Sequence, residues 1–364
     1  MWLVGCLFGS SHMKICSLKR YARVQARWLI ILALGLAAFS PGPRDGVGAQ
    51  ATRQRRVGSN LPEPQAGGEQ TIRVGTQLVN VLFSATDKEN RYLNDLTKSE
   101  VTVLENGKPQ EIFTFKREQD LPLTIAILVD VSNSVIPILP RLTVASSRFI
   151  NSVMRPGQDQ TALIQFDNEA VLIRDLTSDP LRLRNGLREI AENAPPPPRR
   201  IYGGLPPPVI FGSRVGGTSI FDSISVACSD LLAGKTGRKT VILFTDGFDT
   251  TSKLRRFEAV EDALRAETVI YAIGVGDAAG EGVNKGELNR ICEPTGGRAF
   301  IPRDAEELDE AFAELEREMR QQYLLAYEPT DDTADGSFRK IEVRIPKRRG
   351  VRVRHRLGYY ALPR

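Results

Sequence analysis

Two aspartates stand at the ends of strongly apolar segments. Asp130 comes directly after Thr124–Val129, and Asp246 follows Val241–Phe244 after one threonine. Near-continuous apolar runs of this length predict strands that are buried on both faces of a parallel sheet. In an open α/β sheet, ligands bind beyond the carboxyl ends of the strands, where the strand order reverses. Two carboxylates at that edge repel each other unless a cation lies between them.

Three hydroxyl side chains accompany these aspartates. Ser132 and Ser134 follow Asp130 at alternate positions, and Thr218 stands just before an expected helix, Ile220–Leu232. Oxygen ligands with few negative charges suit Mg²⁺, for which Mn²⁺ or Ca²⁺ can substitute. The plainer alternative is that the hydroxyls only cap helices and the aspartates only form turns. We predict a metal site, and its ligands are Asp130, Ser132, Ser134, Thr218 and Asp246.

The segment that carries these residues alternates between strand and helix patterns. Such alternation indicates right-handed crossovers and a parallel sheet covered on both faces. Residues 121–322 are therefore predicted to form a doubly wound, mostly parallel α/β domain. The expected strands are Thr124–Val129, Ala162–Phe166, Ala170–Ile173, Val241–Phe244, Val269–Val275 and Phe300–Ile301. The expected helices are Leu142–Val153, Pro180–Ala191, Ile220–Leu232, Phe257–Leu264, Lys285–Cys292 and Leu308–Met319.

Strand patterns without helices flank this domain on both sides. Before it, alternating apolar residues predict a strand over Val79–Ala85, and a second strand is expected at Val101–Glu105. Asn106-Gly107 then predicts a tight hairpin turn, with Ile112–Phe115 as the returning strand. After the domain, three strands are expected, and they are Tyr323–Tyr327, Arg339–Ile345 and Val351–Arg356.

Neither flanking β segment is large enough to be stable alone, because a small sheet with open edges and one apolar face is marginal in water. We therefore predict that residues 71–120 and 323–364 pack as one small all-β sandwich, with the α/β domain inserted between them. The first strand of such a domain starts, and its last helix ends, near the face opposite the ligand site. The sandwich should accordingly lie on the side away from the metal site.

The first 49 residues differ in charge from the rest of the chain. They hold six basic side chains and one acid, which accounts for the whole net charge of +5. The basic residues precede an apolar run, Trp28–Phe39, and small residues follow at Gly46–Ala49. This is the order of a secretory signal peptide. Residues 1–49 are predicted to be a signal peptide or an uncleaved membrane anchor, starting at Met1 or Met13, and residues 50–70 a linker.

Composition and charge exclude several classes of protein. A chain with 41% hydrophobic and 26% charged residues has the composition of an ordinary soluble protein, and four cysteines are too few for a disulfide framework. Because the chain after residue 49 is formally neutral, we expect no nucleic-acid partner. Ala233–Thr236 resembles part of a phosphate loop, but Ser229 stands where that pattern needs glycine, so we expect no nucleotide. The expected location is the periplasm, the cell envelope or the medium.

The five predicted ligands closely resemble the metal-ion-dependent adhesion site (MIDAS) of von Willebrand factor type A (VWA) domains, over about residues 121–322. The flanking segments Val101–Gln110, Tyr323–Tyr327 and Arg356–Tyr360 are similar to the exported VWA-related proteins typical of acidobacteria. The resemblance implies a protein-binding or adhesion module rather than an enzyme. In that family the metal keeps one coordination position open, and an acidic side chain of a partner protein completes it.

Two other functions are kept as alternatives. A metal-dependent hydrolase needs a general base or nucleophile near the metal. The ligand segments contain no His, Cys or Lys, although Asp249 is close in sequence, and a Ser-His-Asp triad could use only His355. A cytoplasmic VWA partner of an AAA ATPase is the other alternative, and the predicted export signal argues against it.

Two further features have open interpretations. The proline-rich stretch Ala194–Gly217 leads directly to Thr218, and it is either a specificity loop beside the metal or a surface insertion. Cys228 and Cys292 lie on different expected helices. They either form a disulfide in an oxidising compartment or remain two buried thiols. We expect the buried thiols.

Overall fold

The structure is a computed structural model, and it describes residues 78–118, 121–194, 217–276 and 282–361. These residues belong to one compact unit, Thr71–Arg364. The predicted signal peptide or anchor, the linker at 50–70 and most of the proline-rich stretch lie outside the described residues. Among the residues described, no helix combines the length and the apolar character needed to cross a bilayer.

The α/β domain is built on a six-stranded sheet with the strand order β10-β9-β8-β5-β6-β7. Every neighbouring pair is parallel except β6 and β7, so β7 is an antiparallel edge strand. All eight residues of β5 and all eight of β8 are buried, as the apolar runs predict. The strands are β5 (Leu123–Asp130), β6 (Gln160–Phe166), β7 (Ala170–Thr177), β8 (Arg238–Thr245), β9 (Thr268–Gly274) and β10 (Ala299–Phe300).

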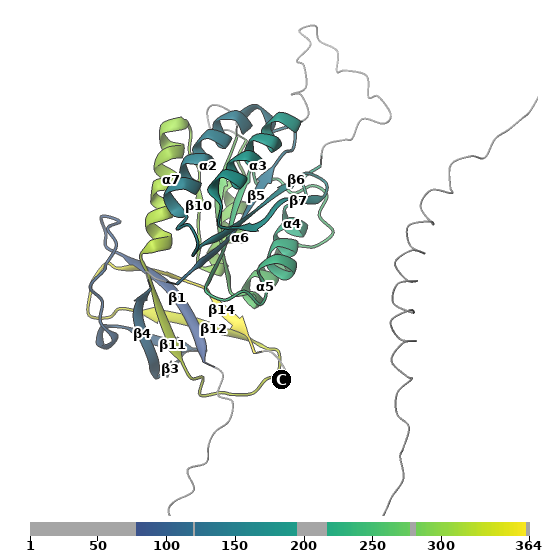
Figure 1. The fold of residues 1–364 in the computed structure, drawn as a ribbon. Helices are drawn as coiled ribbons and strands as arrows, with labels where there is room; N and C mark the ends of the chain where they lie inside the picture. Colours follow the sequence, from purple (N-terminus) through teal and green to yellow (C-terminus); the bar gives the residue numbers. More distant parts are fainter. Residues whose placement is uncertain (1–77, 119–120, 195–216, 277–281, 362–364) are drawn as a thin grey trace, which may run out of the picture. The chain divides into compact units, whose positions relative to one another are not determined.

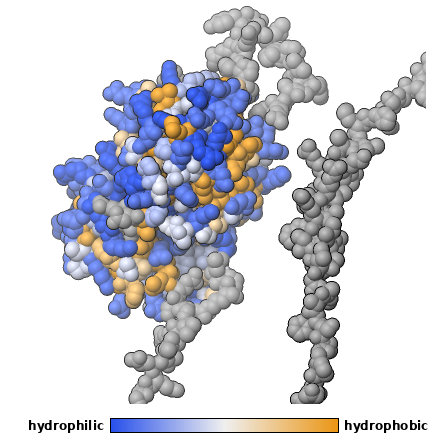
Figure 2. Space-filling model, viewed as in Figure 1, coloured by the Kyte–Doolittle hydropathy of each residue, from blue (hydrophilic) through white to orange (hydrophobic). Residues whose placement is uncertain are grey.

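Helices cover both faces of this sheet (Figure 1). One apolar core lies under α2, α3 and α7, and a second lies under α4, α5 and α6. The surface in view over α2, α3 and α7 is mostly hydrophilic, as expected for amphipathic helices (Figure 2). The helices are α2 (Leu139–Val153), α3 (Pro180–Asn193), α4 (Ile220–Val226), α5 (Arg256–Arg265), α6 (Lys285–Cys292) and α7 (Ala305–Arg320). Short 3₁₀ turns lie at Lys98–Glu100, Ile136–Ile138 and Glu293–Thr295, and α4 continues as a π-helical turn at Ala227–Leu232.

The strand order reverses at β5. The chain moves from β5 to β6 on one side, and later returns to β8 on the other side of β5. The carboxyl ends of β5 and β8 therefore flank the switch point at which α/β proteins bind ligands. The predicted doubly wound fold is confirmed, and it places the ends of the two strands next to each other.

The flanking segments form two four-stranded antiparallel sheets, with the orders β13-β1-β11-β4 and β14-β12-β2-β3. Each sheet takes strands from both sides of the α/β domain, and the described segments share one apolar core. In that core Phe83 stacks on Tyr323, with 5.3 Å between ring centroids. The strands are β1 (Val79–Thr86), β2 (Thr102–Glu105), β3 (Lys108–Gln110), β4 (Ile112–Glu118), β11 (Gln322–Tyr327), β12 (Phe338–Arg344), β13 (Arg352–His355) and β14 (Gly358–Tyr360).

The hairpin after β2 differs from the prediction in its returning strand. Asn106 and Gly107 form the turn, with φ of 49° and 81°, but the returning strand is β3, Lys108–Gln110. The expected strand Ile112–Phe115 belongs to β4, which pairs with β11 in the other sheet. Pro109 weakens the strand pattern of β3, and the sequence therefore did not indicate β3 as the partner of β2. A fourth strand after the α/β domain, β14, was also not expected.

A buried carboxylate joins the two parts of the unit. Glu318, near the end of α7, is 1% exposed and pairs with Arg298 at 2.7 Å. It also accepts a hydrogen bond from the Tyr92 hydroxyl, which lies in the loop after β1, at 3.3 Å. A charge buried in this way needs its partners, so this contact favours one arrangement of the sandwich against α7.

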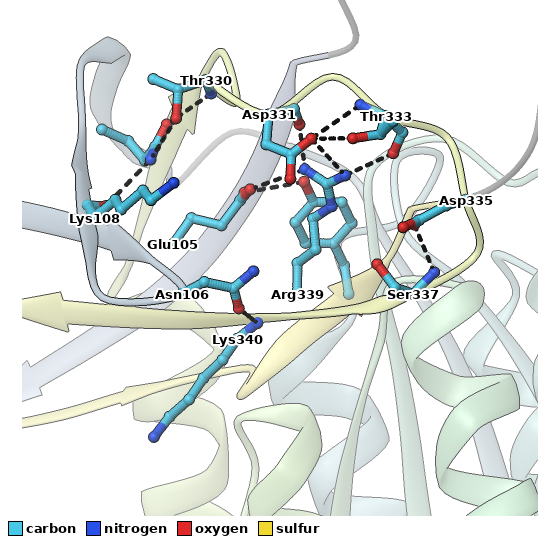
Figure 3. A network of polar contacts seen from close by, with 12 residues as sticks. Glu105, Asn106, Lys108, Thr330, Asp331, Thr333, Asp335, Ser337, Arg339 and Lys340 are labelled. Carbon is cyan, nitrogen blue, oxygen red and sulfur yellow. Dashed lines mark hydrogen bonds and ion pairs between the residues drawn. The ribbon is translucent and has the colours of Figure 1, made fainter.

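A buried arginine of β12 holds the acidic loop between β11 and β12. Arg339 pairs with Glu105 at 3.3 Å, and both side chains are 2% exposed. Its guanidinium also donates to the carbonyl oxygens of Asp331 and Thr333 and pairs with the Asp331 carboxylate (Figure 3). Glu105 accepts two further hydrogen bonds, from the hydroxyls of Tyr327 at 2.7 Å and Tyr359 at 3.0 Å. The network fixes an acidic loop around a positive charge that the chain itself supplies.

We predict a pH-dependent stability from His355 in β13. Its Nε2 accepts the Val343 N–H at 3.2 Å, so the folded state needs a neutral ring, and burial lowers the pKa of His355 below 6.5. Below pH 6.5 the unfolded state binds a proton that the folded state resists, so the free energy of unfolding should decrease as the pH falls. Urea unfolding at pH 8 and at pH 5.5 measures the decrease.

The matched variant is His355→Gln, whose amide oxygen can accept the same hydrogen bond without titrating. The raised pKa of Asp130 acts in the opposite sense, so the difference between the two proteins isolates the contribution of His355. Identical pH dependence in both proteins would contradict the prediction.

Candidate metal centre

Asp130 lies at the last position of β5 and is completely buried. The parallel register that pairs Val129 with Phe244 brings it beside Thr245 at the end of β8. Its Oδ1 accepts the Ser132 N–H at 2.8 Å, and its Oδ2 accepts the Thr245 hydroxyl at 2.6 Å. Burial raises the pKa of Asp130 to about 6, the charge of Asp246 adds to the rise, and the hydrogen bonds oppose it. The ionised form is therefore short of a compensating positive charge.

The two serines come together in the turn that follows β5. Their hydroxyl oxygens are 3.1 Å apart, with Ser132 buried and Ser134 exposed. The Ser132 carbonyl accepts the N–H groups of Val135 at 3.0 Å and Ile136 at 3.2 Å, which closes the turn. Ser132 and Ser134, which alternate in the sequence, therefore have adjacent hydroxyls in the turn that follows Asp130.

Thr218 stands immediately before α4 and is held to the loop that follows β8. Its N–H donates to the Thr250 hydroxyl at 2.8 Å, and its carbonyl accepts the Thr250 N–H at 2.9 Å. A Cβ at Gly217 would lie 2.2 Å from side-chain atoms of Asn168 and Thr251, so a larger residue there would force these side chains to move. The start of α4 is therefore packed tightly between the turn after β6 and the loop after β8.

Asp246 follows β8 and is 5% exposed. Its Oδ1 accepts the Phe248 N–H at 3.0 Å, and its carbonyl accepts the Asn284 N–H at 2.7 Å. Gly247 has φ +84°, and a Cβ at this position would lie 3.0 Å from Leu288, so the tight turn after Asp246 requires glycine. Hydrogen bonds within the chain thus hold both the backbone and the carboxylate of Asp246.

Sequence reasoning missed the residues that position the predicted ligands. Asp249 Oδ2 accepts the N–H groups of Ile220 at 2.8 Å and Phe221 at 3.3 Å, so this carboxylate caps the start of α4. The Asp167 carbonyl accepts both the N–H and the hydroxyl of Ser219, at 2.7 and 2.8 Å. No sequence pattern relates these partners, because they lie 28 or more residues apart.

The donor set fits a hard divalent cation. Contacts or charge interactions link Asp130 with Ser132, Ser132 with Ser134, and Asp130 with Asp246, whereas Thr218 is held by Thr250 in the loop after β8. Two carboxylates with three hydroxyls supply only oxygen, which Mg²⁺ and Ca²⁺ prefer. Among the described residues, no three or more His, Cys, Asp or Glu side chains form a group that could hold a metal ion.

The two cysteines and His355 are also described by the structure. Cys228 and Cys292 are both buried and both free thiols, and burial raises the pKa of each thiol. The His355 ring is engaged by backbone groups on both nitrogens, with Nδ1 2.7 Å from the Arg356 carbonyl. A catalytic triad through His355 is therefore not supported by the structure.

Two family models, both described as von Willebrand factor type A domain, match residues 125–248 and 211–314. No curated protein matches the chain. Among solved structures, BatB from Bacteroides thetaiotaomicron is 18% identical, with a TM-score of 0.41 over 55% of this chain and 100% of that one. The vWF domain of the pilus tip protein Mfa5 from Porphyromonas gingivalis is 14% identical, with a TM-score of 0.40 over 55% and 95% of the two chains.

A third similar structure is proximal thread matrix protein 1 from the mussel byssus, described with zinc in its MIDAS motif. It is 16% identical, with a TM-score of 0.41 over 59% of this chain and 49% of that one. These likenesses are weaker than the family-model matches, which rest on the sequence itself. Between residues 125 and 314 this chain belongs to the von Willebrand factor type A domain family.

Proposed function

We propose that the chain is an exported protein-binding module whose VWA domain holds a divalent cation, with Mg²⁺ as the expected ion. The observation that supports this most directly is the position of two buried carboxylates, Asp130 at the end of β5 and Asp246 directly after the neighbouring strand β8. Asp130, Ser132, Ser134, Thr218 and Asp246 would hold the ion. The bound cation would supply a positive charge that attracts an acidic side chain of a partner protein.

The chain's own residues keep this site ready for a ligand. The loop Gly247–Ser252 hydrogen-bonds to the start of α4, through Thr250 on Thr218 and through Asp249 on Ile220. A preformed site loses little conformational freedom on binding, which favours affinity. Ser134 is exposed, so the ligand set opens to solvent on the side where a partner would approach.

The hydrogen bonds of Asp249 favour a binding function over a hydrolase. This carboxylate is the acid close in sequence that could have served as a general base. Its Oδ2 instead accepts two backbone N–H groups and the Ser252 hydroxyl, so it is occupied at the helix start. A base must be free to take a proton from water or substrate.

Capture of partners from envelope extract tests this function. The chain from Gln50 onward, immobilised, should retain partner proteins in Mg²⁺ and lose them in EDTA. Amidation of the carboxylates in the extract should also abolish capture, since the proposed partner offers an acidic side chain. The matched control is the Asp130→Ala protein, which should capture nothing in either buffer. Equal capture in Mg²⁺, in EDTA and by the variant would refute the proposed function.

A further inference from the structure

One fully buried hydroxyl links the Asp130 carboxylate to the turn that carries Asp246, and it is not itself among the predicted ligands. Thr245, the last residue of β8, is 0% exposed. Its Oγ1 donates to Asp130 Oδ2 at 2.6 Å and accepts the Gly247 N–H at 3.2 Å. A single oxygen atom therefore connects the end of β5 to the turn that carries Asp246.

The first consequence concerns the orientation of Asp130. Its Oδ1 is held by the Ser132 N–H and its Oδ2 by the Thr245 hydroxyl. Two donors on different oxygens fix the rotation of the carboxylate plane, whereas one donor leaves it free to turn. Without the hydroxyl, Oδ2 would lose this donor in a place that water does not reach.

The second consequence concerns Asp246. The Gly247 N–H that binds Thr245 Oγ1 belongs to the turn in which Gly247 has φ +84°. The Asp246 carbonyl on the same turn is held by the Asn284 N–H at 2.7 Å. Thr245 thus fixes the distance between the turn and Asp130, and with it the relation between the two carboxylates.

We propose that Thr245 is a positioning residue that sets the geometry of both carboxylates and thereby favours Mg²⁺ over Ca²⁺ at this site. This inference rests on the proposed function, because it requires the cation to bind there. Mg²⁺ demands nearly ideal octahedral geometry at short distances, while Ca²⁺ accepts irregular and flexible oxygen sets. A loosened carboxylate pair should therefore penalise Mg²⁺ more than Ca²⁺.

Calorimetric titration of the chain from Gln50 with MgCl₂ and with CaCl₂ tests the proposal. Thr245→Val keeps the shape and removes the hydroxyl, and it should weaken Mg²⁺ binding about 10–100-fold, the usual effect of losing a group that orients a metal ligand. Ca²⁺ binding should weaken less, so the ratio of the two affinities shifts toward Ca²⁺. Thr245→Ser restores the hydroxyl and should restore both the Mg²⁺ affinity and the ratio.

Thr161→Val is the matched control. Thr161 is 1% exposed on β6, which β5 separates from β8, and its hydroxyl has no hydrogen-bond partner among the described residues. The Thr161→Val control should leave the affinities for Mg²⁺ and Ca²⁺ unchanged. If Thr245→Val does not fold, Thr245→Ala provides a second protein without the hydroxyl. An unchanged affinity ratio in the hydroxyl-free protein, or a serine variant that behaves like valine, overturns the role of Thr245. A wild-type protein that binds neither ion overturns the proposed function as well.

Discussion

Asp130→Ala should abolish binding of Mg²⁺ and Mn²⁺ while leaving the fold intact. The substitution removes one of two carboxylates that the site offers, and loss of a direct ligand should exceed the roughly 10–100-fold effect of losing a supporting group. The buried carboxylate is costly without a cation, as its raised pKa indicates, so the metal-free variant should be at least as stable as the wild type. Calorimetry measures the affinity, and thermal unfolding in EDTA measures the stability.

Asp175→Ala is the appropriate control for this experiment. Asp175 is an exposed acid on the edge strand β7 of the same domain, so its removal changes the net charge equally. Its affinity for both ions should equal that of the wild type. A wild type and an Asp130→Ala protein with equal affinity would exclude Asp130 as a ligand.

Arg339→Met should destabilise the β-sandwich by about 3–5 kcal/mol, the usual cost of removing one partner from a buried ion pair. Glu105 would keep its two tyrosine hydroxyls but lose the only guanidinium that pairs with it among the described contacts. The carbonyl oxygens of Asp331 and Thr333 would also lose their donor. Urea unfolding followed by tyrosine fluorescence measures the change.

Two further variants make this result specific. Arg344→Met lies on the same strand β12 and breaks an ion pair with Glu342 whose members are 56% and 43% exposed, so it should leave the stability nearly unchanged. The double variant Glu105→Leu and Arg339→Met removes the uncompensated charge and should recover most of the loss. A single Arg339→Met variant within 1 kcal/mol of the wild type would contradict the argument.

The sequence was informative about the α/β domain because its strands and helices have strong local patterns. β5 and β8 are buried along their whole length, so their apolar runs are unbroken, and α7 places Leu308, Phe312, Leu315 and Met319 on one buried face. The metal site followed from these elements, since parallel strands bring their carboxyl ends to one edge of the sheet. The ligand roles themselves stay predictions.

Errors arose where non-local pairing decides the structure. β3 is three residues long and contains proline, so its pairing with β2 depends on the turn rather than on its own pattern. β4 alternates like a hairpin strand, yet it pairs with β11, more than 200 residues away in the chain. The capping of α4 by Asp249 and the hydroxyl bridge of Thr245 were invisible for the same reason, because each links side chains that only the folded chain brings together.

The pairing of β1 with β11 determines how the molecule would respond to tension. β11 follows α7 almost directly, so a pull on the VWA domain reaches Gln322 at the start of β11. A pull on the chain before Val79 reaches the start of β1. Because β1 and β11 are antiparallel, the start of β1 and the start of β11 lie at opposite ends of the pair. In this register Val79 faces Tyr327 and Phe83 faces Tyr323. The ladder bonds run perpendicular to the strands, so such a pull would stretch all of them together instead of opening them one after another. The sandwich should thus resist sliding of β1 along β11.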